Sequence, residues 1–247
     1  MAAIEITTLA RRPELHERLP ELYGIWPEFM INDRIGYILF GRVAELFPEQ
    51  CVVGTAGDEL VAAGRSIPFV FPEPDRPELP DGGWDQVLMW GISDQRRGRR
   101  PTVSSALEIL IKPAHTGRGL SHLMLAALRD AVRALGHPTL YAPVRPNGKT
   151  DAGLPMDRYA ALVRDDGLPV DPWLRVHVRA GGTIERIAPA SMVVADSLDR
   201  WRQWTGLPFD TDGPVTVPQA LVPVHCSLAH NHAVYVEPNV WVRHDLR

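Results

Sequence analysis

The sequence predicts an α/β fold, with one large domain and an appended segment at its C-terminal end. Segments with the two-residue apolar spacing of strands alternate along the chain with segments that have helical spacing. In the centre, a strand-like run, a glycine loop, an amphipathic helix and a second strand-like run follow one another directly. That order is typical of a βαβ unit, whose two strands are parallel. The length of 247 residues exceeds that of a usual single domain but is short for two.

The first seventy or so residues predict a strand, two helices and a hairpin. Pro20 and Gly24 are expected to bend or break the first helix. Asn32-Asp33 is suited to be the N-cap of the second helix, whose apolar stripe includes Ile38. The predicted elements are a strand at Ile4–Leu9, a helix at Pro13–Met30, a second helix after Asp33 that runs to Leu46, and strands near Cys51–Thr55 and Leu60–Phe71.

The βαβ unit follows in the centre of the chain. The apolar run Ser104–Pro113 predicts its first strand. Apolar residues at i, i+3, i+4 and i+7 predict a helix over Leu120–Leu135, and Gly136 and Pro138 end it. The run Thr139–Pro146 predicts the second strand, parallel to the first.

The rest of the chain alternates loops with short elements. Residues 72–83 are rich in Pro, Asp and Gly and predict a loop. The other predicted elements are a helix that opens at Asp81 or Gly83, a short helix around Pro155–Val163, a helix at Pro172–Ala180, a strand at about Thr183–Ile187, a helix at about Ser197–Thr205, and a final hairpin with strands near Val215–Ser227 and Ala233–His244.

Composition and charge exclude several classes of protein. Hydrophobic residues make up 45% and charged residues 23% of the chain, as in an ordinary globular protein with a substantial core. A net charge of −4 argues against a general nucleic-acid binder, because affinity for phosphates comes from clustered Lys and Arg. Cys51 and Cys226 support no disulfide framework. Without a secretory signal or a bilayer-spanning apolar run, the chain is expected to be cytoplasmic, with no membrane partner.

The loop His115–Gly119 carries the clearest chemical signal. A helix N-terminus offers unpaired N–H groups and the positive end of the helix dipole, which together bind a phosphate. Gly117 and Gly119 let the backbone approach such an anion closely. The loop lacks the third glycine of the dinucleotide fingerprint and the Gly-Lys pair of the P-loop. A plain tight turn is the alternative, but a strand before the loop and a long helix after it favour a phosphate site.

At this loop the sequence resembles the GNAT superfamily of acyl-CoA-dependent N-acyltransferases. The family motif, [Q/R]-x-x-G-x-[G/A], is matched by Thr116-Gly117-Arg118-Gly119-Leu120-Ser121, in which Thr and Ser replace the usual first and last residues. The element order up to about Arg186 also fits the family. The resemblance implies a mixed, mostly antiparallel twisted sheet with parallel, splayed central strands, flanked by helices and followed by an extended C-terminal region.

The resemblance also implies where the parts of the domain lie. Residues 1–189 would form the acyl-CoA-binding core, with insertions at about 72–103 and 147–171, and residues 190–247 would complete the same domain. The acyl-CoA arm would enter a wedge between the splayed strands. Pro143 and Pro146 fit a strand whose ladder is interrupted there, because proline donates no backbone hydrogen bond. The implied cofactor-binding residues are Ile109, Ile111, Thr116, Gly117, Arg118, Gly119, Leu120, Ser121, His122 and Asn147.

Amide formation from a thioester needs a general base that deprotonates the amine, and it is helped by an acid that protonates the departing thiolate. By resemblance, His177 stands where the family has its acidic Tyr, and Tyr159 is the rival acid; a surface histidine is the alternative for His177. Glu108 is the candidate base, since burial on its strand would raise its pKa, unless it faces outward. Glu28 and Phe29 lie in the helical region that covers the acceptor site in the family.

The predicted activity is transfer of an acetyl or other acyl group from coenzyme A to a primary amine of a small molecule or peptide, by a monomer or homodimer. Two alternatives stay open. One is an acyltransferase that takes longer chains from an acyl carrier protein, and the other is a non-catalytic acyl-CoA-binding sensor or partner module. His225, Cys226, His230 and His232 fit no common zinc spacing, so no metal is predicted.

Overall fold

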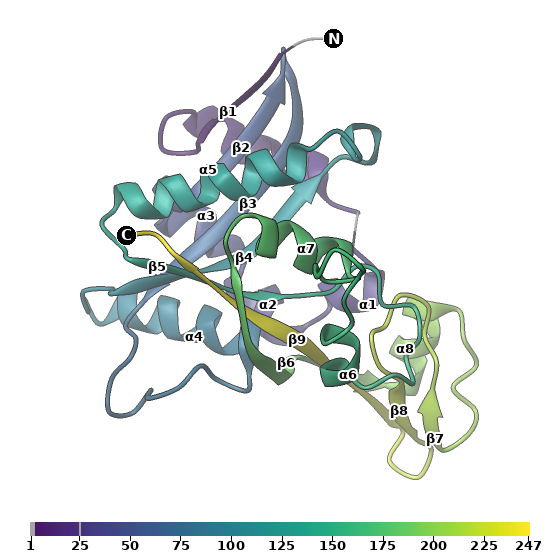
Figure 1. Ribbon diagram of the computed structural model, residues 1–247. Coiled ribbons are helices and arrows are strands. Elements are labelled where there is room, and N and C mark those ends of the chain that lie inside the picture. The colour runs from purple at the N-terminus through teal and green to yellow at the C-terminus, as the bar shows by residue number, and fades with distance from the viewer. Residues whose placement is uncertain (1–2, 25) are drawn as a thin grey trace.

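One mixed sheet runs through the computed structural model, which describes residues 3–24 and 26–247 (Figure 1). The order of its strands is β1-β2-β3-β4-β5-β9-β8-β7, and β6 pairs with β9 away from this path. The strands are β1 (Ile4–Thr8), β2 (Cys51–Ala56), β3 (Glu59–Phe69), β4 (Val103–Ile111), β5 (Thr139–Val144), β6 (Thr183–Ser197), β7 (Gly213–Val215), β8 (Val224–Ser227) and β9 (His232–Asp245).

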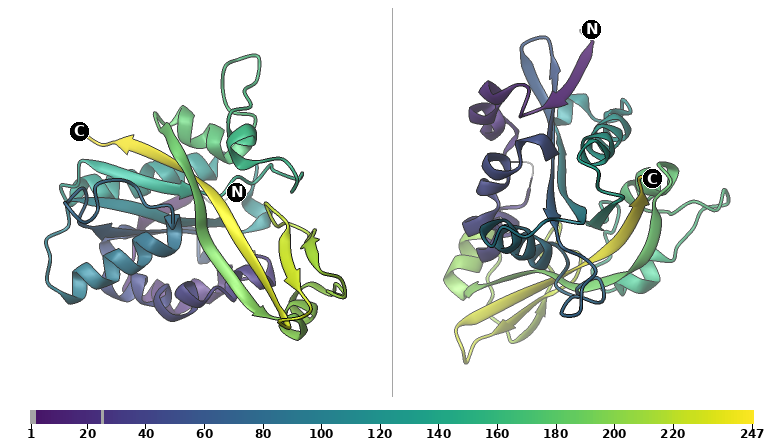
Figure 2. Two further views of the ribbon diagram at one scale, coloured as in Figure 1. Left: turned by 90° about the horizontal axis from the view of Figure 1, so that it is seen from below. Right: turned by 90° about the vertical axis from the view of Figure 1, so that its left-hand side faces the viewer.

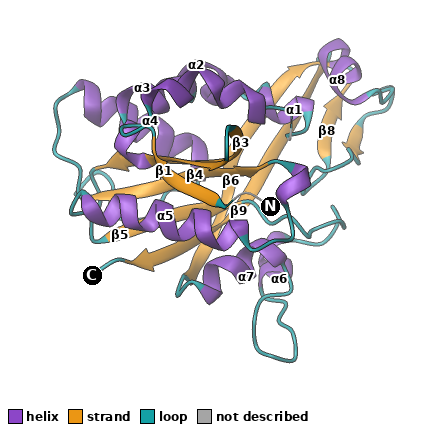
Figure 3. Cartoon of the chain, turned by 90° about the horizontal axis from the view of Figure 1, so that it is seen from above, coloured by secondary structure: helices purple, strands orange, loops and turns teal. Residues whose placement is uncertain are grey.

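Helices cover both faces of this sheet, as Figure 3 shows from above. They are α1 (Glu28–Ile31), α2 (Arg34–Leu39), α3 (Gly41–Leu46), α4 (Gly83–Arg96), α5 (Leu120–Ala134), α6 (Met156–Ala160), α7 (Pro172–Arg179) and α8 (Leu198–Thr205), with 3-10 turns at Pro13–Leu22, Pro48–Gln50 and Pro113–His115. Among the described residues, no helix combines the length and the apolar character needed to cross a membrane.

Two apolar clusters hold the layers together. On one face α3 and α4 pack against the sheet through residues such as Val43 and Leu88. On the other face α5 packs through Met124, Leu128 and Val132, the inward stripe that helical spacing predicts. The right-hand view of Figure 2 shows the sheet between these two helical layers. The predicted α/β fold class, with its mostly antiparallel sheet, is confirmed.

The central strands are parallel and splayed. β4 and β5 pair only at Ser104↔Leu140 and Ser105↔Tyr141, and the two strands then separate. Beyond this point β4 pairs only with β3, and β5 continues along β9, where Pro143 lies opposite Trp241. The strands therefore part at one end of the sheet, as the resemblance implied.

The C-terminal region extends this sheet with a long ladder. β6 runs alongside β9 from Thr183↔Arg243 to Ser197↔His232, and both strands reach past the central sheet in Figure 2. The prediction that the strand ends at Ile187 is wrong. Pro189 ends the apolar pattern, but it lies within a register shift between Ala188 and Met192, where the missing N–H is tolerated.

Two other predicted elements differ from the structure. The helix expected over Pro13–Met30 is a 3-10 segment followed by the short α1, and Ile25 within it lies outside the described residues. The helix expected from Asp33 to Leu46 is divided into α2 and α3 at Phe40, so the side chain of Ile38 is 66% exposed rather than part of an apolar stripe. In the final hairpin, residues 216–223 are loop rather than strand.

Candidate active site

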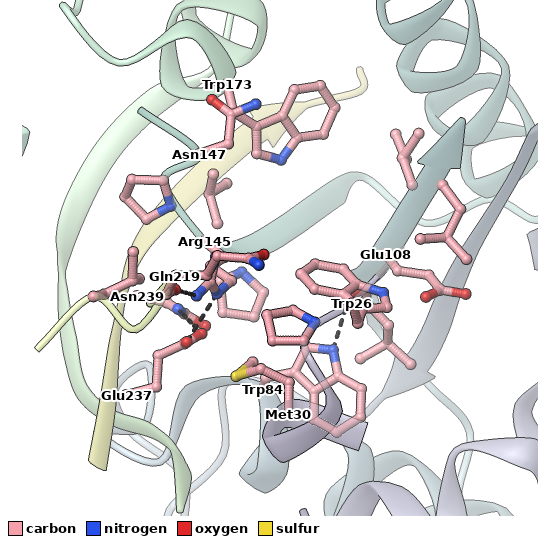
Figure 4. A pocket seen from close by; sticks show the side chains of 18 of the residues that line it. Trp26, Met30, Trp84, Glu108, Arg145, Asn147, Trp173, Gln219, Glu237 and Asn239 are labelled. Carbon is pink, nitrogen blue, oxygen red and sulfur yellow. Dashed lines mark hydrogen bonds and ion pairs between the residues drawn. The ribbon is translucent and has the colours of Figure 1, made fainter. Parts of the chain in front are cut away.

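A cavity of about 1390 Å³ opens where β4 and β5 separate. Its walls come from both parted strands, from the glycine loop at the start of α5, from α1 and α2, and from the loop at residues 216–221. Figure 4 shows its interior, with Glu108 on one side, Arg145, Glu237 and Asn239 on the other, and indole rings between them. The cavity therefore joins the predicted donor region to a chamber lined by charged and aromatic side chains.

The glycine loop forms one end of the cavity. Gly117 and Gly119 have φ angles of 72° and 77°, in the left-handed region that glycine adopts without strain, and Gly119 is the N-cap of α5. No atom lies within 4 Å of the place where a Cβ would stand at either position. The hydroxyl of Thr116 turns away from the cavity, because it donates to the carbonyl of Pro113 at 2.8 Å. The backbone at both glycines therefore borders open space at the N-terminus of α5, which suits an anionic group.

Most of the predicted cofactor residues border this space. Those that line the cavity are Ile109, Ile111, Thr116, Gly117, Gly119, Leu120, Ser121, His122 and Asn147. Arg118 is not among the lining residues described here. These residues come from β4, the glycine loop, the first turn of α5 and the segment after β5, which the splayed strands bring to one cleft.

Glu108 lies inside the cavity wall, next to a buried cation. It stands directly opposite Arg65 on β3, and the carboxylate oxygen Oε1 lies 3.3 Å from Nε of Arg65 without the alignment of a hydrogen bond. The side chain of Glu108 is only 6% exposed. Burial raises its pKa, while Arg65 and the side chain of Trp26 act in the opposite direction. The carboxyl can therefore hold a proton at a higher pH than an exposed glutamate.

A β-bulge places the indole of Trp84 beside Glu108. The register between β3 and β4 shifts so that Leu107 has no partner on β3. The carbonyl of Leu107 instead accepts a hydrogen bond from Nε1 of Trp84 at 2.8 Å. Ser191 on β6 fixes the other end of Trp84, since its hydroxyl accepts from the main-chain N–H at 2.9 Å. Trp84 is thus held rigidly between the two halves of the sheet.

A polar network closes the far side of the chamber. Glu237 is fully buried on β9, and its carboxylate accepts from Nε of Arg145 at 2.8 Å, from the hydroxyl of Tyr235 at 2.8 Å and from Nδ2 of Asn239 at 3.0 Å. Arg145 also donates through Nη2 to the carbonyl of Gln219 at 2.5 Å. Three donors therefore share the charge of Glu237, and the network ties the end of β5 to β9 and to the loop at 216–221.

Asp33 at the cavity wall interacts with a second carboxyl, that of Asp85. Asp33 caps α2 by accepting from the N–H of Gly36, and Asp85 accepts from the N–H of Val193. In each, the other carboxyl oxygen is buried and receives no N–H donor among the described residues. Burial and the neighbouring Asp33 raise the pKa of Asp85 to about 8, and burial raises that of Asp33. The pair is therefore stable at neutral pH with a proton between the two carboxyls.

The two predicted acids are both engaged with other side chains. His177 on α7 borders the cavity but is only 2% exposed, and its Nδ1 lies 2.9 Å from Nε2 of His244. Burial, together with His244 and Arg129, lowers the pKa of His177 well below its usual value, so the imidazole is neutral. Tyr159 is not among the residues lining the cavity, and its hydroxyl donates to Asp171 at 3.1 Å.

The predicted acceptor residues point away from the chamber. Glu28 is exposed at the start of α1, and Phe29 packs against Trp201 and Tyr235 in a third apolar cluster. Their neighbours Trp26 and Met30 line the cavity instead. A short helix presents adjacent residues to different sides, so the prediction identified the segment but not its inward residues.

Arg145, Glu237 and Asn239 were absent from the sequence-based prediction. Glu237 and Asn239 flank Pro238 inside the apolar run Ala233–Val242 of β9, and polar residues in such a run are a sign of a buried network. Arg145 stands between the two prolines that the prediction did single out. Their contact depends on β9 returning beside β5, which no local pattern shows.

Comparison with known proteins gives a relative that matches nearly the whole chain. No family model matches. The arginine N-acetyltransferase avaD of Aspergillus versicolor is 32% identical over 274 residues, which cover 98% of this chain and 93% of avaD. This identity is high enough, over enough of both chains, to show common descent.

Two solved structures share the fold. The loading GNATL domain of CurA from Lyngbya majuscula has a TM-score of 0.65 and 18% identity, and the match covers 99% of this chain and 98% of that domain. The GphF GNAT-like decarboxylase, solved in complex with isobutyryl-CoA, has a TM-score of 0.60 and 19% identity over 99% of this chain and 100% of that one. At such identities the likeness concerns the fold alone.

Proposed function

The chain belongs to the GNAT superfamily of acyl-CoA-dependent N-acyltransferases, and on this premise we propose that it acetylates the primary amine of arginine, or of a similar small cationic amine, with acetyl-CoA as donor. The observation that carries the proposal is the single cavity that joins the open glycine loop to a chamber with Glu108 on one side and Arg145 on the other. The full-length relative avaD, named for arginine acetylation, supports this choice of acceptor.

The donor end is suited to the diphosphate of coenzyme A. The open backbone at Gly117 and Gly119 and the first N–H groups of α5 would bind it, with the helix dipole adding to the attraction. The pantetheine arm would lie in the gap between β4 and β5, where residues 106–111 of β4 have no partner on β5. When bound, acyl-CoA supplies an activated thioester carbonyl.

At the acceptor end Glu108 is suited to act as general base. The amine must lose a proton to become a nucleophile, and a carboxylate with a raised pKa accepts it more readily than an ordinary glutamate does. As the nitrogen–carbon bond forms and the carbon–sulfur bond breaks, the ammonium of the acceptor gives up two protons: Glu108 accepts one and passes it to solvent, and the other balances the proton that the departing thiolate takes up. Main-chain N–H groups of β4 that face the gap would stabilise the intermediate oxyanion.

The source of the proton for the thiolate stays a prediction. His177 borders the cavity, but its neutral imidazole would need a proton from elsewhere before it could donate one. Tyr159 would have to give up its hydrogen bond to Asp171. Turnover retained in both His177→Ala and Tyr159→Phe would rule out an acid role for these two residues.

The proposal is tested by incubating the protein with acetyl-CoA and a panel of amines and measuring thiol release together with the mass of the product. We expect thiol release with arginine, matched mole for mole by acetylarginine. Parallel reactions with a carrier protein bearing an acyl-phosphopantetheine arm test the alternative donor. Binding of acetyl-CoA without thiol release for any amine would contradict the proposal and indicate a sensor instead.

A further inference from the structure

Arg145 lies at the cavity wall with part of its guanidinium uncommitted. Its side chain is 16% exposed and lines the cavity at the end of β5. Nε donates to Glu237 and Nη2 donates to the carbonyl of Gln219, which hold the group in place. Within residues 3–24 and 26–247, Nη1 has no hydrogen-bond acceptor in the protein. A fixed guanidinium with a free edge is the geometry that proteins use to bind carboxylates.

The charges on this wall leave room for one more anion. Lys149 is buried beside Arg145, and its ammonium donates only to main-chain carbonyls, those of Asp151 and Leu221. The wall therefore carries Arg145 and Lys149 against the carboxylate of Glu237; burial lowers the pKa of Lys149, and the charge of Asp151 partly offsets this effect. The carboxylate of Asp151 is at the surface and accepts from the N–H of Gly153.

The contact with Glu237 leaves Nη1 of Arg145 able to donate a hydrogen bond to a second anionic partner. The carboxylate of Glu237 also receives hydrogen bonds from Tyr235 and Asn239, so Arg145 is one of three donors to it, and any excess of positive charge on this wall comes from Lys149. Buried cations without sufficient counter-charge are costly. An anionic group of a ligand at Nη1 would lower that cost.

The position of Trp26 relates this wall to Glu108. Cζ of Arg145 lies 6.0 Å from the centre of the Trp26 ring. The side chain of Trp26 also donates a hydrogen bond to the carboxyl of Glu108. Figure 4 shows Trp26 between the two charged residues. A ligand in contact with this ring can therefore direct an anionic group toward Arg145 and an amine toward Glu108.

We propose that Arg145 binds the carboxylate of the acceptor, so that the enzyme selects free amino acids over the amines that lack this carboxylate. The inference rests on the proposed function of the same cavity. It assigns Arg145 to substrate selection, with Lys149 adding positive potential and Glu237 orienting the guanidinium.

The test compares matched pairs of acceptors that differ only in the carboxylate: arginine with agmatine, ornithine with putrescine, and lysine with cadaverine. We expect the wild-type protein to favour the amino acid of a pair by about 10- to 100-fold in kcat/KM, the usual effect of a charge-assisted hydrogen bond. In Arg145→Met this preference should disappear, because KM for the amino acid rises by more than KM for the matching amine. Arg158→Met, an exposed residue of α6 away from the cavity, is the matched control and should keep the preference.

Removal of Arg145 also leaves Glu237 buried without its cation, which can destabilise the fold. The double variant Arg145→Met with Glu237→Gln removes this charge, and its melting temperature and acetyl-CoA affinity report that the protein is folded. Equal use of both members of every pair by the wild type, or an unchanged preference in the double variant, would overturn the inference. In either case acetylation itself is still observed, whereas failure of the proposed function would give no acetylated product from any acceptor.

Discussion

At Glu108, burial and a neighbouring cation act on one carboxyl in opposite directions. Burial raises its pKa, and Arg65 at 3.3 Å limits the rise by stabilising the charged form. A base in this environment accepts a proton from an ammonium more readily than an exposed glutamate does. At Asp85 a second carboxyl, Asp33, takes the place of the cation, so that burial and the neighbouring charge both raise the pKa, to about 8.

Glu108→Gln should lower kcat by a factor of about 10² to 10⁴, the usual contribution of a general base, and leave the affinity for acetyl-CoA unchanged. In the wild type, kcat/KM should fall as the pH is lowered through the raised pKa of Glu108, because the base must be ionised to accept a proton. Steady-state kinetics across pH measure both effects. An acid limb that persists unchanged in the variant would assign it to another group.

The stability of the fold should decrease as the pH rises toward about 8. The pKa of Asp85 is higher in the folded state than in the unfolded chain, so the folded state binds more protons between those two values. The free energy of unfolding therefore falls as the pH increases through this window. Asp85→Asn keeps the acceptor for the N–H of Val193 but cannot ionise, and urea unfolding at pH 6 and pH 9 should show a smaller loss for this variant. Equal losses would mean that Asp85 does not titrate there.

At the scale of elements, α5 begins and ends with a glycine in the left-handed region, Gly119 and Gly136, but only its N-terminal end borders the cavity. The two glycines have φ angles of 77° and 82°, and neither has an atom within 4 Å of a Cβ position. A substitution at either site causes similar backbone strain, so the pair separates strain from loss of binding.

Gly119→Trp should weaken acetyl-CoA binding by more than about tenfold, because the indole would occupy the space in front of the first N–H groups of α5. Gly136→Trp should lower the melting temperature to a similar extent and bind acetyl-CoA as the wild type does. Isothermal titration calorimetry measures both affinities. Equal acetyl-CoA affinity in the two variants would contradict the proposal that this loop binds the diphosphate.

Elements with a strong local pattern could be predicted from the sequence, and those set by distant partners could not. The helical stripe of α5 and its glycine end predicted that helix closely. The predicted strand at Thr183–Ile187 is shorter than β6, because the continuation of β6 past Pro189 depends on its pairing with β9, which lies far along the chain. For the same reason, the sequence pointed to Glu108 and the glycine loop but missed Arg145 and Glu237, which meet only when β9 returns beside β5.

At the scale of the whole molecule, the acceptor chamber is built from parts that are distant in sequence. Trp26 precedes α1 and Arg145 directly follows β5. Gln219 lies in the loop between β7 and β8, and Glu237 belongs to β9. The loop between β7 and β8 is held by Arg145, by Lys149 and by the N–H of Leu221, which donates to the hydroxyl of Tyr235 at 2.9 Å. In the proposed arrangement, the region after β5 contributes Arg145, Gln219 and Glu237 to the acceptor side, and the glycine loop and α5 form the diphosphate end of the donor side.

Tyr235→Phe should raise the KM for the acceptor and leave the affinity for acetyl-CoA unchanged. The variant removes the hydroxyl that accepts from Leu221 and donates to Glu237, and each lost buried hydrogen bond costs about 1–3 kcal/mol. We therefore also expect a lower melting temperature. A change in acetyl-CoA affinity without a change in acceptor KM would contradict this division between the two sides of the cavity.

The most direct test of the account is the reaction itself, with purified protein, acetyl-CoA and arginine, followed by thiol release and by mass spectrometry of the amino acid. The account predicts one acetylated arginine for each thiol released, and loss of both products in Glu108→Gln. Release of thiol without any acetylated amine, or no release from a protein that binds acetyl-CoA, would contradict it.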